Sequence, residues 1–301
     1  MTDSPQTLAQ YLAAEGERVN ARLRLIMQDR CGDFPRLEEA MRYSLFAGGK
    51  RLRPILAITA CRACGGDDEL VLPFAAAIEM IHTFSLIHDD LPAMDDDDFR
   101  RSRPTNHKVF GEAQAILAGD ALLSEAFRVM ADRALYPAIP AETGLAVMRE
   151  VADAAGVCGM VGGQSLDLIS ENREIEPEVL DLVHRCKTAR FIAASAVVGG
   201  LVANAPAERI AALREYGEKI GLAFQIVDDC LNASGDTATT GKSVGGDAKH
   251  GKATYPAHYG LEESRARARA RADEAIAALG VFGAEADRLR EIARFIVDRD
   301  R

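Results

Sequence analysis

The sequence lacks the features that mark a membrane-spanning, secreted or disordered protein. Its 301 residues contain no low-complexity tract, and 48 % of them are hydrophobic, which is enough to bury a substantial core. The longest apolar run, residues 191–205, is interrupted by Ser195 and two glycines. Because this run is shorter than the roughly 20 residues of a spanning helix, it predicts a buried core helix. Residues 1–17 show no basic start followed by an apolar stretch, which predicts a cytoplasmic protein.

An excess of positive charge is also missing. The net charge is -10, and the field of such a chain repels nucleic acid and anionic membranes, which argues against both as the main partner. A polyanionic substrate would therefore have to be held by local cations or by metal ions.

The six cysteines do not form a recognisable metal or redox site. Cys61 and Cys64 make a CxxC pair, but a second pair or a histidine pair that would complete a zinc site is absent from the sequence. We therefore expect free thiols and no disulfide framework.

Runs of alternating β-branched residues are missing as well. Alanine, leucine, arginine and glutamate dominate, and nearly every segment follows a helical period, which predicts an all-α protein. Glycines and prolines separate the helical segments, but no long linker divides them. The expected architecture is a single domain over residues 1–301, with about ten or more helices around a central cavity.

A first functional motif lies at residues 46–54. The pair Gly48 and Gly49 frees the backbone, and Lys50, Arg51 and Arg53 follow within five residues. Such a segment is suited to holding phosphate. For this motif alone, a turn between helices with a solvated basic end is the simpler interpretation.

The most informative stretch is the acidic segment that follows an apolar helix at residues 74–90. Steps of four residues from Ile81 lead to Asp89, so this carboxylate continues the buried stripe, which is costly unless it is paired or bound to metal. Asp95 is about 240° further around an ideal helix. The break at Pro92 is therefore expected to bring Asp95 back beside Asp89. A bare acidic run at residues 95–98 would otherwise indicate a solvated turn neutralised by nearby arginines.

A second carboxylate pair occurs far along the chain. Asp228 and Asp229 end another apolar stripe, four residues after Phe224, and Gly217 and Gly221 would allow close helix contact. Two such pairs predict two acidic walls that face each other across a partly apolar cavity. Oxygen-only ligands favour Mg²⁺, which commonly bridges carboxylates to phosphates. The pattern suits departure of a diphosphate from a hydrocarbon.

The motifs together resemble those of the bacterial trans-isoprenyl diphosphate synthases, and most closely the members that make farnesyl diphosphate. They are GGKRLRP at 48–54, IHDDLPAMDDDDFRR at 87–101, PTNHKVFGEAQAILAGDALL at 104–123, GQSLDL at 163–168, KTA at 187–189, FQIVDD at 224–229 and GKATYP at 251–256. The resemblance covers nearly the whole chain. It implies a homodimer of the all-α prenyl synthase fold that acts on isopentenyl diphosphate and an allylic diphosphate.

The resemblance also implies roles for individual residues. Three Mg²⁺ ions would be held by Asp89, Asp90, Asp95 and Asp228. The allylic diphosphate would be held by Arg100, Lys187, Thr188, Gln225, Lys242 and Lys252, and isopentenyl diphosphate by Lys50, Arg53, His82 and Arg101. The residues expected to act in catalysis are Asp89, Asp95, Arg100, Lys187 and Lys242. In the family, the allylic diphosphate ionises, isopentenyl diphosphate attacks the cation, and a proton is lost, with released diphosphate as the usual candidate base.

Two features bear on the product. Phe84 lies five residues before Asp89, about 7.5 Å along the helix axis, and Ser85 follows it. This pair resembles the bacterial pattern for a C15 product, whereas a simple core role for Phe84 is the alternative. Asn232 stands where the second acidic motif usually has aspartate, which is expected to weaken contacts to Mg²⁺ or lysine without abolishing them.

Several other functions remain open at this point. A C20 or C10 product is the nearest alternative. A class I terpene cyclase would share the fold but has no need for a second diphosphate site, so Lys50, Arg53 and Arg101 argue against it. An inactive regulatory subunit typically loses its acidic motifs, and both are present here apart from Asn232.

Overall fold

The computed structural model describes residues 6–28, 30, 32–234 and 252–298. Helices dominate these residues, as predicted, and the only strands among them are the short pair β1 and β2. The first half contains α1 (Leu8–Ile26), α2 (Pro35–Leu45), α3 (Leu52–Ala63), α4 (Asp68–Asp89), β1 (Phe99–Arg100), β2 (Arg103–Pro104), α5 (Asn106–Phe110), α6 (Glu112–Ala131) and η1 (Arg133–Leu135). The second half contains α7 (Ala141–Ala155), α8 (Met160–Ser170), α9 (Pro177–His184), the π-helical turn η2 (Arg185–Ala189), α10 (Arg190–Val202), α11 (Ala207–Ser234), α14 (Tyr255–Tyr259), α15 (Leu261–Ala278), η3 (Leu279–Val281), η4 (Ala284–Ala286) and α16 (Asp287–Val297).

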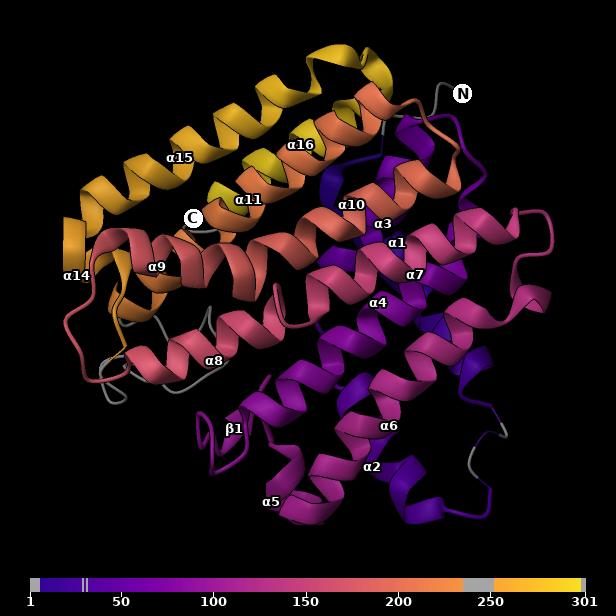
Figure 1. Ribbon diagram of the computed structural model, residues 1–301, viewed down its shortest axis with the longest axis horizontal. Coiled ribbons are helices and arrows are strands. Elements are labelled where there is room, and N and C mark those ends of the chain that lie inside the picture. The colour runs from indigo at the N-terminus through magenta and orange to yellow at the C-terminus, as the bar shows by residue number, and fades with distance from the viewer. Residues whose placement is uncertain (1–5, 29, 31, 235–251, 299–301) are drawn as a thin grey trace.

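The helices pack around α3, α4 and α10 (Figure 1). Helices α11 and α15 run side by side in the upper part of the view, and α6 lies along α4 in the lower part. The run at residues 191–205 is buried from Phe191 to Gly200, as predicted, but α10 ends at Val202 and residues 201–205 are partly or fully exposed. Helices α8 and α9 and strand β1 lie on the left, at the side where α4 ends.

Two glycines of α11 allow it to pack closely against α10 and the preceding turn η2. A Cβ atom at Gly217 would overlap Ala193, and one at Gly221 would overlap Ala189. Because both positions lack a side chain, the helix backbones come into direct contact, as the sequence predicted. This contact fixes the position of the C-terminal half of α11, which carries Asp228.

Helix α4 is the one helix of the described residues that is long and apolar enough to span a membrane. In this structure 78 % of the most apolar 18-residue segment of α4 is buried inside the protein. Its N-terminus is capped by Asp67, whose carboxylate accepts a hydrogen bond from the Glu69 amide at 3.0 Å. A core helix of a globular protein accounts for both observations.

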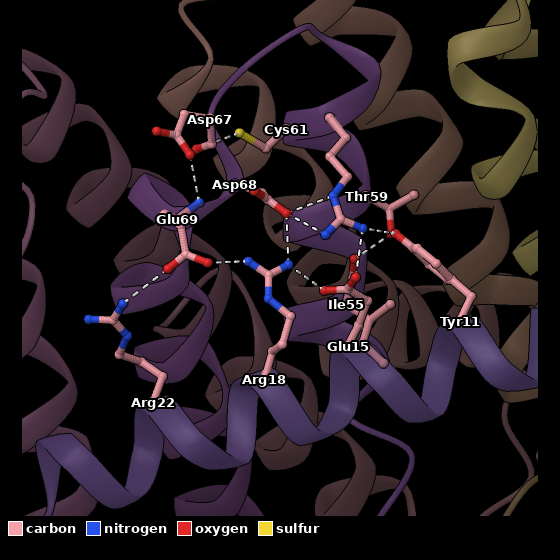
Figure 2. A network of polar contacts seen from close by, with 11 residues as sticks. Tyr11, Glu15, Arg18, Arg22, Ile55, Thr59, Cys61, Asp67, Asp68 and Glu69 are labelled. Carbon is pink, nitrogen blue, oxygen red and sulfur yellow. Dashed lines mark hydrogen bonds and ion pairs between the residues drawn. The ribbon is translucent and has the colours of Figure 1, made fainter. Parts of the chain in front are cut away.

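Helix α1 is attached to α3 and α4 by a network of charged side chains (Figure 2). The Arg18 guanidinium contacts Glu15 at 2.8 Å, Asp68 at 2.7 Å and Glu69 at 2.5 Å. Arg62 of α3 contacts Glu15 at 2.7 Å, and its Nε donates to Asp68 at 2.7 Å. Arg18 and Arg62 therefore each have at least two carboxylate partners, while Arg22 at the edge of the network pairs with Glu69 at 3.5 Å.

The five described cysteines are free thiols. Cys61 is buried on α3, and its Sγ donates to the Asp67 carbonyl at 3.6 Å, while Cys64 caps the same helix. Burial raises the pKa of the Cys61 thiol to about 12, so this thiol stays protonated and is a packing residue.

Candidate active site

A cavity of about 870 Å³ opens where the C-terminal ends of α4 and α11 approach α8, η2 and the segment 252–254. Its polar end is lined by Lys50, Arg53, His82, Asp89, Asp95, Arg100, Arg101, Asp167, Lys187, Thr188, Gln225, Asp228, Asn232 and Lys252. Its lining also includes the apolar side chains of Phe84, Met160, Val161 and Leu168, together with His88. A volume of this size is typical of sites for small organic ligands.

The first acidic wall forms where α4 ends. The chain turns back after Asp90, and the Asp95 amide donates to the Asp89 carbonyl at 2.8 Å. The two residues are thus adjacent despite their separation on an ideal helix, which confirms the prediction made from Pro92. Asp95 is buried to 9 % exposure, and both aspartates line the cavity.

Asp90 differs from its neighbours. The residue is 3 % exposed, and its carboxylate accepts hydrogen bonds from the Arg100 side chain, at 2.8 Å from Nε and 2.6 Å from Nη2. Asp90 is not among the residues that line the cavity. Asp98 is exposed and pairs with Lys108 at 2.6 Å, so the acidic run separates into cavity-facing, arginine-bound and surface carboxylates.

The hairpin β1–β2 carries the two arginines back to the cavity. Its turn residues Arg101 and Ser102 both have positive φ, at 52° and 60°. The Arg101 guanidinium donates to the Gly48 carbonyl and lies over Gly49, where a Cβ would be 2.5 Å from Cζ. Gly49 has φ of 117°, so both its backbone conformation and this contact exclude a side chain. The glycine pair therefore brings Arg101 beside the basic segment at residues 50–53.

The basic end of the cavity, formed by Lys50, Arg53 and Arg101, contains a buried guanidinium group, that of Arg53, for which no carboxylate partner is seen among the described residues. Arg53 is buried to 9 % exposure, and its Nη1 lies 3.4 Å from Nε2 of His82. Its Nε has no hydrogen-bond partner among the described residues. Burial lowers the pKa of Arg53 to about 10, and burial together with the neighbouring Arg53 and Arg101 lowers that of His82 well below 6.5. This positive end therefore fits an anionic ligand.

The second acidic wall lies on α11. Asp228 lines the cavity, as predicted, and Asn232 follows it one turn later. Asp229 is buried instead and accepts hydrogen bonds from Gln225 Nε2 at 3.1 Å and from the Tyr255 amide at 3.0 Å. Asp229 thus anchors the segment after residue 251 to α11. The sequence showed only its pairing with Asp228 and gave no sign of this role.

Two lysines lie beside Asp167 of α8, and one of them also reaches the first acidic wall. Lys187 Nζ lies 2.7 Å from Asp167 Oδ2, and Lys252 Nζ lies 2.7 Å from Asp95 Oδ1 and 3.9 Å from Asp167. Although burial lowers it, the charge of Asp167 raises the pKa of Lys187 overall. Thr188 follows in the π-helical turn and donates to Gln225 Oε1 at 3.0 Å. Asp167 had no assigned role in the sequence, although it lies within the quoted GQSLDL motif.

The remaining predicted residues are distributed as follows. Phe84 is 8 % exposed and faces the cavity next to Ser85, whose hydroxyl donates to the His82 carbonyl at 2.9 Å. Lys242 lies outside the described residues. The assignments of individual residues to metal, allylic diphosphate or isopentenyl diphosphate stay predictions.

The donor set fits a hard cation that also binds a ligand. Within residues 6–28, 30, 32–234 and 252–298, no three acidic, histidine or cysteine side chains form an all-protein metal cage. Mg²⁺ typically takes only one or two carboxylates and completes its shell with water and phosphate oxygens. Asp89 and Asp95 offer such carboxylates at the end of α4 and Asp228 offers one on α11, and all three line the same cavity.

Comparison with known proteins gives consistent results. The family model for polyprenyl synthetase matches residues 34–291. A farnesyl diphosphate synthase of Bacillus subtilis is 44 % identical over 264 residues, covering 88 % of this chain and 89 % of the relative. A geranylgeranyl diphosphate synthase of Cyanophora paradoxa is 46 % identical and covers 87 % of each chain. The crystal structure of an FPP/GFPP synthase from Zymomonas mobilis superimposes with a TM-score of 0.86 at 36 % identity, covering 96 % of this chain and 98 % of that one.

Proposed function

The chain belongs to the polyprenyl synthetase family and is a short-chain trans-prenyltransferase with the isoprenoid synthase fold, and we propose that its product is (2E,6E)-farnesyl diphosphate. The observation that carries this proposal is the position of Phe84. This side chain is buried, faces the cavity and lies about 7.5 Å along α4 from Asp89. An aromatic ring at that depth limits how far a hydrocarbon extends below the acidic walls.

The relatives support prenyl transfer more directly than they support a chain length. The Bacillus subtilis relative is named for a C15 product and the Cyanophora paradoxa relative for a C20 product, at nearly equal identity. A C20 or C10 product is therefore the alternative that an experiment has to exclude. Phe84 favours C15 because it is bulky and Ser85 beside it is small.

We assign the two substrates to the two charged regions of the cavity. The allylic diphosphate lies between the acidic walls, where Arg100, Lys187, Thr188, Gln225 and Lys252 gather. Isopentenyl diphosphate lies at the basic end, with Lys50, Arg53, His82 and Arg101. The neutral imidazole of His82 offers a hydrogen bond there without adding charge.

We further propose that the enzyme requires Mg²⁺, with three ions expected. When bound, Mg²⁺ neutralises negative charge on the leaving diphosphate. The residues that would hold it are Asp89, Asp95 and Asp228. The Asp90 carboxylate is hydrogen-bonded to Arg100 instead and would orient that guanidinium group.

The protein side chains bind and orient the substrates and do not attack them. Lys187, Lys252 and Arg100 place fixed positive charge where the allylic C–O bond breaks. The apolar walls then exclude water from the allylic cation until the double bond of isopentenyl diphosphate attacks it. The departing diphosphate is the expected acceptor of the proton that is lost.

A homodimer in the cytoplasm is proposed as the working form. Apolar side chains on neighbouring helices are exposed, with Ile116 at 43 % and Leu117 at 50 % on α6 and Leu145 at 63 % on α7. Such a surface is suited to burial against a second copy. Light scattering of the purified protein tests this point.

The function is tested by chromatography of the reaction products. The purified protein is incubated with isopentenyl diphosphate, Mg²⁺ and either dimethylallyl or geranyl diphosphate, and each starter should give a C15 product. Labelled isopentenyl diphosphate should enter the product, which a terpene cyclase would not allow. A predominant C20 product would overturn the proposed chain length, and no condensation at all would indicate a regulatory subunit.

A further inference from the structure

The ring of His88 packs against the ring of Phe84. The two residues are four apart on α4 and therefore share one face of the helix. Their rings meet edge to face, with centroids 5.0 Å apart and an interplanar angle of 80°. Both line the cavity.

Helix α6 supports the other side of this imidazole. His88 Nε2 lies 3.1 Å from the carbonyl oxygen of Ile116, so the ring carries a proton on Nε2 and donates it to that oxygen. A Cβ atom at Gly119 would lie 2.6 Å from Cδ2 of His88 and still closer to Nε2. The absence of a side chain at Gly119 thus leaves room for the imidazole, which is wedged between the backbone of α6 and the ring of Phe84.

We propose that His88, seated on Gly119, is a specificity-determining residue that holds Phe84 across the end of the cavity. This inference rests on the proposed function, because Phe84 limits chain length only if the ligand is a growing hydrocarbon. His88 acts through Phe84. Without the imidazole, the Phe84 ring turns into the vacated space against α6, and the cavity deepens toward that helix.

The hydrogen bond to Ile116 makes this support directional. A ring held only by packing could slide along α6, whereas an imidazole tied to a helix carbonyl stays in one orientation. The Asp120 carboxylate lies further away, at 3.9 Å from Nε2, and is 60 % exposed, so the contact to Ile116 at 3.1 Å is the closer polar anchor. The hydrocarbon that this arrangement recognises is the tail of a C15 prenyl diphosphate.

The test is the ratio of C20 to C15 product in four variants: His88→Ala, Phe84→Ala, the double variant and Gly119→Ala. Loss of an edge-to-face ring contact corresponds to roughly a 2- to 10-fold change in the population of the closed arrangement. We expect the C20 to C15 ratio to rise by that factor in His88→Ala and by more in Phe84→Ala. The double variant should match Phe84→Ala alone, because His88 acts through that ring.

Gly119→Ala gives an independent test in the opposite direction. The added methyl group displaces the imidazole toward Phe84 and the cavity, so the share of C10 product should increase. The ratio is measured among the products formed, so it does not depend on how much of each variant folds.

Two results would overturn the proposal. One is an unchanged ratio in His88→Ala while Phe84→Ala lengthens the product, and the other is an additive effect in the double variant. If the wild type itself releases mainly C20, the proposed function fails separately, and the shift of each variant relative to the wild type still decides the role of His88.

Discussion

Helix α3 carries two arginines, of which Arg62 is paired with carboxylates and Arg53 is placed beside a histidine. Arg53 and Arg62 are nine residues apart, which places them on opposite faces of the helix. Arg62 contacts Glu15 of the α1 network at 2.7 Å and also pairs with Asp68, whereas Arg53 Nη1 lies 3.4 Å from Nε2 of His82. Burial lowers the pKa of both, but the hydrogen bond to Glu15 raises that of Arg62 overall, while that of Arg53 falls to about 10.

The difference shows that charge in this protein serves two purposes. Cations matched by carboxylates within the fold hold helices together, because each partner would be costly to bury alone. A buried cation without such a match costs stability in the unliganded protein and is offset when an anion binds. The presence or absence of a carboxylate partner therefore distinguishes the structural arginine of α3 from the one expected to bind a ligand.

The largest effect is expected for Arg53→Met. Loss of a charge-assisted bond to a phosphate group should lower kcat/KM for isopentenyl diphosphate by about 100-fold, since such bonds are worth about 1.5–3 kcal/mol each. The melting temperature should stay unchanged or rise, because an unmatched buried charge is removed. Steady-state kinetics and thermal denaturation check both parts. A lower melting temperature with unchanged kinetics would remove the distinction between the two arginines.

Arg62→Met should show the opposite pattern. The free energy of unfolding should fall by about 2 kcal/mol, because Glu15 and Asp68 each lose a partner. The kinetic constants of the folded protein should remain within about twofold. Urea denaturation measures the first quantity. The matched control is Arg24→Met, which breaks an exposed pair with Glu17 and should leave the free energy of unfolding unchanged.

Lys252→Met tests a third kind of cation, one that lines the cavity but is paired with a carboxylate in the free protein. Its partner, Asp95, is also expected to bind metal. The ammonium group lies 2.7 Å from Asp95 and would compete with a divalent cation for it. Mn²⁺ should therefore bind the variant about 3- to 10-fold more tightly in the absence of substrate, as measured by electron paramagnetic resonance. The control is Lys219→Met, which lies on the surface beside Glu274. Weaker Mn²⁺ binding in the Lys252 variant would contradict this competition.

The last prediction concerns pH. Burial lowers the pKa of His184 to about 3, so below pH 6.5 the unfolded chain binds a proton that the folded chain does not, and stability decreases as the pH falls from 6.5 toward 3. The slope per histidine is at most about 1.4 kcal/mol per pH unit. Burial raises the pKa of Asp68, but hydrogen bonds from Arg18 and Arg62 lower it overall, so the α1 network loses stability only at a pH below 3.8.

His184→Gln should therefore flatten the dependence of the melting temperature on pH between 6.5 and 4.5, and Arg62→Met should not. Part of the slope should persist in His184→Gln, because the pKa of buried His82 is also lowered. An unaltered slope in the His184 variant would show that this histidine is protonated in the folded protein.

The sequence predicted those features that depend on local geometry. The helical stripe to Asp89, the return of Asp95 after Pro92 and the close contact at Gly217 follow from helix periodicity and from the properties of proline and glycine. Partners that are brought together only by folding were not predictable. The bond between Asp90 and Arg100 and the role of Asp167 between two lysines depend on how separate segments pack.

The π-helical turn at residues 185–189 also escaped prediction, because a local change from i→i+4 to i→i+5 hydrogen bonding leaves no distinct residue pattern. It places Lys187 and Thr188 in succession at the cavity wall. Predictions from sequence were thus strongest for individual helices and weakest for contacts across the cavity.

The pair formed by Lys252 and Asp95 has a consequence for the order in which the molecule folds. Its two residues are 157 positions apart, and the bond between the Tyr255 amide and Asp229 spans 26. Closing a longer loop costs more chain entropy, so contacts of wide sequence separation form after the helices and their local turns. In a refolding experiment, helical circular dichroism should therefore return before catalytic competence, and the capacity to bind diphosphate should be among the last properties the chain regains.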